Sequence, residues 1–253
     1  MSDYKIEAGT AQHVGDRLQQ HDRAALYKAP HAPGCMLAVV ADGGHNAIGA
    51  DQALHTARQL FETFKAGDGA SVERIATLLR EMVHEIHHVL LMDPLATSAE
   101  ARATLALLVL TPQRQAVWAT VGDTRLYRFA DGACAERSGD SDYIDHLVTV
   151  DKVPPEAAAR HRASRLLANV AGNTLKAPFA AIGSRCDLQA GDAFLLCTDG
   201  AWSWFSDSEL AAAVSRRRPR DAAQLLIDKA RERAAGSGDN CTMALVRLVA
   251  RED

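Results

Sequence analysis

The sequence predicts an α+β fold in which pairs of helices lie outside packed sheets. Segments with apolar residues at helical spacing come in two pairs, one in the first half of the chain and one in its last quarter. Short runs of apolar residues stand around these pairs, each about the length of one buried strand. Amphipathic helices and apolar strands bury their faces against each other, so the combination indicates a layered architecture.

The first helical pair is predicted at residues 48–65 and 71–91. In both segments, apolar residues recur three and four positions apart, which places them on one helix face. The run KAGDG occupies 65–69, and its glycines and aspartate predict a turn between the two helices. The pair is therefore expected to form a hairpin that covers one face of a sheet.

The expected sheets contain five apolar strands. These runs are the most continuously apolar in the chain, as is typical of strands in a sheet interior. They lie at 36–40, 104–110, 116–121, 193–197 and 242–249.

The second helical pair is predicted at 207–215 and 221–235. Ser206 and Glu209 have the spacing of a capping box and mark the start of the first of these helices. Residues 133–165 look polar and irregular, apart from a short helix that begins at Pro154-Pro155. We interpret 138–165 as a flap over the surface of a single domain that spans residues 1–253.

Composition excludes several classes of protein. The chain has 253 residues and a net charge of −4, which argues against nucleic-acid binding. The sequence contains no apolar run of about 18 residues, so we expect no membrane span. The five cysteines form no CxxC pair, and an odd number of cysteines indicates a reducing compartment, so we expect the cytoplasm.

Acidic residues stand where the predicted strands end. Asp42, Asp123 and Asp199 follow strands within three residues, and Asp239 lies just before the last strand. Each has a glycine neighbour, which allows the backbone to turn sharply and approach a ligand. Taken singly, each pair of aspartate and glycine is explained as a turn. Taken as a set, clustered carboxylates repel each other and fit divalent cations that prefer oxygen ligands.

Five motifs that contain these aspartates resemble, in order, those of the metal-dependent protein phosphatases, the type 2C serine/threonine phosphatases, in their compact bacterial form. The motifs are RLQQHD (17–22), VVADGGH (39–45), VGDTRLY (121–127), LLCTDG (195–200) and DNCT (239–242). The resemblance implies an α-β-β-α sandwich with two central antiparallel sheets flanked by helical pairs. His21 departs from the pattern, because an acidic residue is usual beside Asp22.

The resemblance also implies the site. The family's two Mn²⁺ or Mg²⁺ ions would be held by Asp42, Asp199, Asp239 and the carbonyl of Gly43. Asp22 would act on an ion or its water from the outer shell, and Arg17 would grip the substrate phosphate. Asp123 would help Asp199 hold a third, weaker ion. The implied nucleophile is a hydroxide that bridges the metals.

The resemblance implies substrates that are proteins phosphorylated on serine or threonine, with a cognate kinase and its targets as partners. Two alternatives remain open at this point. One is a phosphatase-like domain with weak or no activity that only binds partners, and the other is a phosphatase of small molecules.

A competing motif lies in the second predicted helix. His84, Glu85 and His88 match H-E-x-x-H, in which the two histidines share one helix face and could bind zinc. The apolar stripe of the helix points them toward solvent, and no third ligand is marked by a motif. A chance match on a surface helix is the preferred interpretation.

Overall fold

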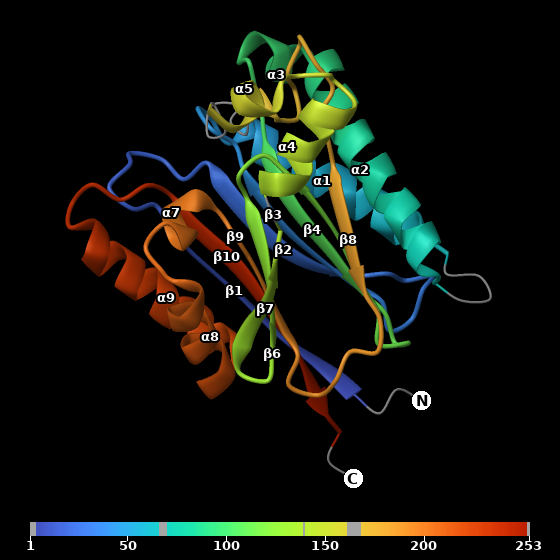
Figure 1. Cartoon of the computed structure of the whole chain (residues 1–253), viewed down its shortest axis with the longest axis vertical. Helices are drawn as coiled ribbons and strands as arrows, with labels where there is room; N and C mark the ends of the chain where they lie inside the picture. The colour runs from blue at the N-terminus through green and yellow to red at the C-terminus, as the bar shows by residue number, and fades with distance from the viewer. Residues whose placement is uncertain (1–3, 66–69, 139, 161–167, 252–253) are drawn as a thin grey trace.

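The structure is a computed structural model that describes residues 4–65, 70–138, 140–160 and 168–251. Two five-stranded sheets lie face to face, and every pair of neighbouring strands is antiparallel (Figure 1). In order across sheet 1 lie β1 (Tyr4–His13), β10 (Cys241–Ala250), β9 (Ala193–Cys197), β6 (Arg125–Ala130) and β7 (Ala133–Arg137). In order across sheet 2 lie β2 (Asp22–Lys28), β3 (Met36–Asp42), β4 (Thr104–Leu110), β5 (Ala116–Val121) and β8 (Ala181–Arg185).

The core between the sheets consists of side chains from their central strands. Val40 and Leu108 of sheet 2 and Phe194 and Val246 of sheet 1 belong to one buried cluster. All four side chains are 0% exposed. Burying a side chain of this kind stabilises the fold by about 1.5–3 kcal/mol, so this layer fixes how the sheets stack.

Two helical pairs cover the outer faces. Helices α1 (Ile48–Thr63) and α2 (Val72–Met92) pack on sheet 2, while α8 (Asp207–Arg216) and α9 (Pro219–Ala234) pack on sheet 1 (Figure 1). The predicted α-β-β-α sandwich is confirmed, and so is the capping box between Ser206 and Glu209. Helix α9 begins earlier than the predicted residue 221, because Pro219 suits the first turn of a helix.

Four further helices belong to the described fold, and one of them corrects an expectation. They are α3 (Pro94–Ser98), α4 (Asp140–Thr149), α5 (Pro155–Arg160) and α7 (Asp199–Trp202). The prediction that 133–165 is irregular is wrong for β7 and α4, although the short helix at Pro155 is confirmed. Of the expected flap, residues 139 and 161–165 lie outside the described residues. Residues 66–69 of the expected turn also lie outside them.

The strand register brings the acidic motifs together at one end of the sandwich. Strands β2 and β3 pair so that Asp22 lies directly opposite Asp42. In sheet 1, the end of β9 pairs with the start of β10, with Cys197 opposite Met243. Asp199 and Asp239 stand just beyond these two strand ends, so both sheets contribute carboxylates to the same edge.

Candidate active site

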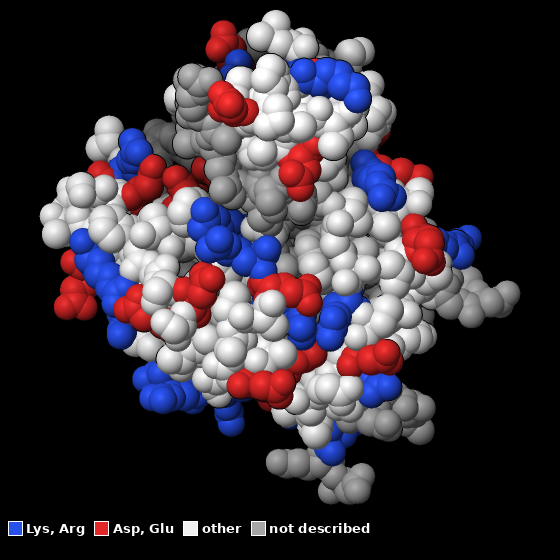
Figure 2. All heavy atoms as spheres, viewed as in Figure 1, with Lys and Arg blue, Asp and Glu red and all other residues white. Residues whose placement is uncertain are grey.

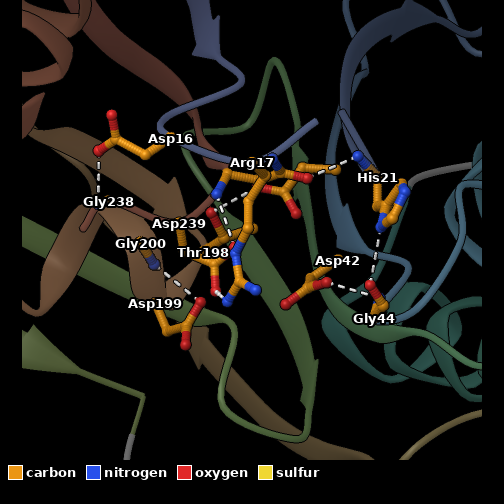
Figure 3. A network of polar contacts seen from close by, with 12 residues as sticks. Asp16, Arg17, His21, Asp42, Gly44, Thr198, Asp199, Gly200, Gly238 and Asp239 are labelled. Atoms are coloured by element: carbon orange, nitrogen blue, oxygen red, sulfur yellow. Dashed lines mark hydrogen bonds and ion pairs between the residues drawn. The ribbon is translucent and has the colours of Figure 1, made fainter. Parts of the chain in front are cut away.

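A pocket of about 700 Å³ opens at this end of the sandwich, and we call it the acidic pocket. Its lining includes all five residues that were predicted to be catalytic, namely Arg17, Asp22, Asp42, Asp199 and Asp239. Figure 3 shows Arg17 extended among three of these aspartates. Arg17 comes from the loop between β1 and β2, Asp22 from the start of β2 that follows it, and the other residues from the end of β3, the start of α7 and the segment before β10. Four separate parts of the chain therefore meet here.

Asp22 is the most deeply buried member of the acidic pocket. It is 1% exposed, and one carboxylate oxygen accepts a hydrogen bond of 2.8 Å from Oγ1 of Thr198. Burial raises its pKa, and the nearby charge of Asp42 raises it further, while the bond from Thr198 partly opposes both effects. The hydrogen bond from Thr198 thus holds the Asp22 carboxylate in position. Ionising this carboxylate costs more free energy than it would in water, because the side chain is buried.

Asp42 and Asp199 each bind a backbone N–H close by in the sequence. Asp42 accepts from the N–H of Gly44 at 2.7 Å, and Asp199 accepts from the N–H of Gly200 at 2.7 Å. Burial nevertheless raises the pKa of Asp42, and it raises the pKa of Asp199 to about 7. The charges of Asp123, Asp42 and Asp239 add to the shift at Asp199. The carboxylates of the acidic pocket therefore repel each other in the protein alone.

Arg17 and Asp239 form an ion pair at the mouth of the acidic pocket. The Nε and Nη2 atoms of Arg17 donate to the two carboxylate oxygens of Asp239 at 2.8 and 2.6 Å. Both side chains are partly open to solvent, at 62% and 42% exposed. This parallel arrangement of two N–H groups is also the one in which guanidinium binds phosphate.

Close backbone approaches hold the loops of the acidic pocket together. Gly15 has a φ of +66°, and a Cβ there would lie 2.2 Å from the carbonyl oxygen of Asp239. A Cβ on Gly200 would lie 2.0 Å from the carbonyl oxygen of Asn240. Only glycine allows both contacts, since a side chain would collide with backbone that cannot move cheaply. The contact at Gly200 explains why a glycine follows Asp199 in the fourth motif, while Gly15 holds the chain just before the first motif against Asp239.

Asn240 and Thr198 are structural residues of the site that were not predicted as site residues. The side chain of Asn240 donates to the carbonyls of Val14 and Gln19 at 2.8 and 2.9 Å, and it accepts from the N–H of His21 at 2.6 Å. One amide thus fastens the loop that carries Arg17 to the start of β10. Both residues stand beside an aspartate within the quoted motifs, and that adjacency is the signal that could have identified them.

His21 lies in the lining of the acidic pocket, but its ring is engaged with the backbone. Its Nδ1 lies 2.9 Å from the carbonyl oxygen of Gly44, the residue whose N–H binds Asp42. The Nδ1–H therefore donates to this carbonyl, which has no proton to give. The imidazole links the first and second motifs across the pocket mouth (Figure 3).

Asp123 and Gly43 are not among the residues that line the acidic pocket. The charge of Asp123 reaches Asp199, and its backbone carbonyl accepts from the indole N–H of Trp202 at 3.0 Å. Gly43 is packed so closely that a Cβ would lie 2.2 Å from the carbonyl oxygen of Asn46. These two predicted metal ligands therefore stand beside the pocket, with Asp123 on the side of Asp199.

The donor set fits a hard divalent cation in its chemistry. Within the described part of the chain, no three His, Cys, Asp or Glu side chains are already arranged to hold one ion. The reason is visible in the contacts, since Asp42, Asp199 and Asp239 each turn an oxygen toward a protein donor. These carboxylate oxygens are the kind of ligand that Mn²⁺ and Mg²⁺ prefer. Burial and, after it, repulsion between carboxylates raise the pKa values of Asp22, Asp42 and Asp199, and a bound cation would offset both effects.

The histidines of the H-E-x-x-H motif lie elsewhere, on α2. His84 and His88 are exposed, and their Nε2 atoms lie 3.1 Å apart. His87 between them is buried, and its Nδ1 accepts from the N–H of Gly172. Among the described residues no third side chain completes a metal site with this pair. The contacts agree with the interpretation of a surface helix.

Known proteins of the same kind are found by sequence and by structure. A family model described as protein phosphatase 2C matches residues 10–225. The serine/threonine phosphatase stp of Listeria monocytogenes is 26% identical over 224 residues, which cover 83% of each chain. PppA of Pseudomonas aeruginosa has a similar structure, with a TM-score of 0.72, 25% identity and coverage of 96% of this chain and 97% of its own.

A further structural neighbour carries metal. It is the catalytic domain of the serine/threonine protein phosphatase PstP in complex with two manganese ions, with a TM-score of 0.65 and 20% identity. The match covers 96% of this chain and 98% of that domain. A protein with this fold thus holds two Mn²⁺ ions, in agreement with the expectation of Mn²⁺ or Mg²⁺ as the cofactor.

The chain belongs to the protein phosphatase 2C family, because the family model matches most of its length. The predictions of the family and of the enzyme class, a metal-dependent protein serine/threonine phosphatase, are confirmed. Among the described helices, none is long and apolar enough to cross a membrane.

Proposed function

We propose that this chain hydrolyses phosphoserine and phosphothreonine in proteins at a binuclear Mn²⁺ or Mg²⁺ centre in the acidic pocket. The observation that carries the proposal is the set of neighbouring aspartates, from buried to partly exposed, that faces the guanidinium of Arg17. The proposed ligands are Asp42, Asp199, Asp239 and the carbonyl of Gly43. We also propose that residues 1–253 form a single catalytic domain in which 138–165 act as a flap.

The metal ions supply the chemistry that the side chains lack: when bound, they polarise the phosphoryl group and activate water for its attack. Asp22 is buried and accepts a hydrogen bond from Thr198. It would act on an ion or its water from the outer shell. Asp123 would assist Asp199 in holding a third ion, because the two charges already interact.

Arg17 has the role of binding the phosphate. Its two N–H donors now face the carboxylate of Asp239, which presents two oxygens much as a phosphate does. If Asp239 held an ion with these oxygens, the guanidinium of Arg17 would be free to bind a phosphate in the pocket. The ion pair therefore keeps Arg17 near its working position.

The named relatives are the support for protein substrates, since several are described as serine/threonine phosphatases. A cognate kinase and its targets are the partners that this activity requires. Figure 2 shows lysines and arginines mixed with acidic residues on one face of the molecule, which supports the exclusion of nucleic acid there. A cytoplasmic location is proposed because the five cysteines are free thiols.

Release of phosphate from phosphothreonine peptides, measured with and without Mn²⁺, tests this function. We expect turnover that needs the added ion, stops on chelation and exceeds the rate on sugar phosphates. A preference for sugar phosphates would favour the small-molecule phosphatase. Metal binding without turnover of either substrate would favour the silent binding domain.

A further inference from the structure

A second cavity, which we call the distal pocket, lies at the opposite end of the sandwich from the acidic pocket. Strand β2 runs from Asp22 in the acidic pocket to Lys28 in the distal pocket, and β3 returns from Met36 to Asp42. Each strand has 7 residues, a length of roughly 20 Å at the usual rise per residue. The two pockets are therefore separate sites on the same strands.

The walls of the distal pocket are mainly apolar. They belong to Ile6, Met36, Leu110, Leu188 and Leu248, where the core between the two sheets comes to an end. Three of these, Leu110, Leu188 and Leu248, are at most 5% exposed, so they form a firm inner wall. The cavity measures about 600 Å³, which is within the usual range of about 300–1,000 Å³ for pockets that bind small organic molecules.

Flat groups border this cavity. Pro30, Pro33 and Pro112 contribute rigid rings to the lining, and Tyr4 contributes an aromatic ring. The guanidinium carbon of Arg114 lies 5.9 Å from the centre of the Tyr4 ring. Rings and a planar guanidinium offer surfaces on which another flat molecule can stack.

The charged residues of the lining are all basic. They are Lys5, Lys28, Arg114 and Arg251, and no aspartate or glutamate is part of the lining among the described residues. Lys5 has an ion pair of 3.4 Å with Glu7, and Arg114 has a longer one of 3.9 Å with Asp187. Both pairs are at the surface, where such contacts stabilise little. An apolar cavity with a positive rim is complementary to an apolar molecule that carries negative charge.

We propose that the distal pocket binds a compact aromatic organic anion, with its rings between the apolar wall and the prolines. Its carboxylate would face Lys28 and Arg114 at the rim. The binding is non-covalent and does not depend on the acidic pocket, from which Lys28 is separated by the length of β2. Arg114 lies at the same distal end, just beyond β4. This gives the protein a second, independent binding site besides the acidic pocket.

Calorimetric titration of the full chain with 2-naphthoate tests the proposal, with 2-naphthylmethylammonium as a probe of similar shape and opposite charge. We expect one saturable site for the anion and at least about tenfold weaker binding of the cation, equivalent to one logarithmic unit in Kd. Absence of saturable binding of 2-naphthoate would overturn the proposal. This holds also if the anion fails to bind because another part of the protein or a peptide already fills the pocket.

Two matched double variants locate the site. Lys28→Gln with Arg114→Gln removes two positive charges from the rim and should weaken naphthoate binding about tenfold or more. Arg216→Gln with Lys229→Gln removes the same charge from α8 and α9 and should leave binding within about twofold. Equal affinities of the two variants would contradict the proposal. A crystal soaked with 6-bromo-2-naphthoate should show the bromine in the distal pocket, and bromine found only in the acidic pocket would also refute it.

Discussion

The side chain of Asp239 has two possible uses, because its oxygens now bind Arg17 and are proposed to bind an ion during catalysis. Exchange between these partners needs little rearrangement, since both side chains are more than one-third exposed. The ion pair itself therefore contributes little to stability. Changes at either residue should affect function more than folding.

Arg17→Lys tests whether the guanidinium fork itself matters. Lysine keeps the positive charge but cannot present two parallel N–H donors to a phosphate. We expect KM for a phosphothreonine peptide to rise about tenfold, a loss of about 1.4 kcal/mol, with a smaller change in kcat. Steady-state kinetics at saturating Mn²⁺ measure this. An unchanged KM in both Arg17→Lys and Arg17→Ala would show that Arg17 does not bind the substrate.

Asp199→Asn and Asp239→Asn test the proposed ligands. Asparagine keeps the size and one acceptor oxygen, but it removes the negative charge that attracts a cation. We expect turnover to fall by at least about 100-fold, or about 2.7 kcal/mol, while the variants still fold and unfold cooperatively on heating. Asp228→Asn on the exposed face of α9 is the control and should be fully active. A folded variant with a normal rate would identify that aspartate as a turn residue only.

At the scale of single elements, the H-E-x-x-H motif of helix α2 gives a prediction about metal binding. His84 and His88 lie on an exposed face in the second half of the helix, while its buried stripe packs on sheet 2. The double change His84→Ala with His88→Ala should therefore leave the Mn²⁺-dependent rate within about twofold, as expected for surface substitutions. Loss of activity together with loss of bound zinc would show that the helix is the catalytic site.

The sequence predicts the central strands well and the outer strands poorly. Strands β4 and β5 are buried at every position, so their apolar runs are unmistakable. Strand β7 alternates between exposed and half-buried residues at the edge of sheet 1, and β1 also has many partly exposed positions. Strand β6 is largely buried, but two arginines interrupt its apolar pattern. Edge strands and interrupted strands depend on partners that only the folded chain supplies.

The same limit applies to the site. Motifs identify Arg17 and the aspartates because the residues of each motif are neighbours in sequence. The bond from Thr198 to Asp22 joins residues that are 176 positions apart, and no local pattern predicts it. Tertiary pairing of β2 with β3 and of β9 with β10 creates such contacts. Roles that depend on these pairings could be found only in the three-dimensional structure.

For the whole molecule, the raised pKa values predict how stability depends on pH. The pKa of Asp199 is about 7 when folded, against an ordinary value of 3.8, and that of Asp22 is also raised. Between pH of about 4 and 7, the folded protein keeps a proton on Asp199 that the unfolded chain releases. The free energy of unfolding therefore falls as the pH rises through this range. Without metal, we expect the melting temperature to fall across this window by at least about 2–4 °C, the equivalent of 1 kcal/mol.

Added Mn²⁺ should counteract this loss, because a cation stabilises the ionised carboxylates. The rise in melting temperature at saturating Mn²⁺ should be larger at pH 8 than at pH 5, where protons compete for the same oxygens. Calorimetry at both pH values measures the difference. The variant Asp199→Asn should show a flatter pH profile without metal, and a profile as steep as that of the wild type would assign the effect to other groups.

Strands β1 and β10 are direct neighbours in sheet 1, with Tyr4 opposite Ala250 and His13 opposite Cys241. On the ribosome, the early strand has to wait for its partner until nearly all of the intervening chain has been made. At about 5–20 residues per second, the wait is on the order of ten seconds or more. Arg17 follows the first of these strands and Asp239 precedes the last, so a nascent chain cannot assemble the pocket. A polypeptide that has not yet been synthesised as far as Asp239 and β10 thus lacks part of the pocket, and the proposed activity can begin only after these residues have been made.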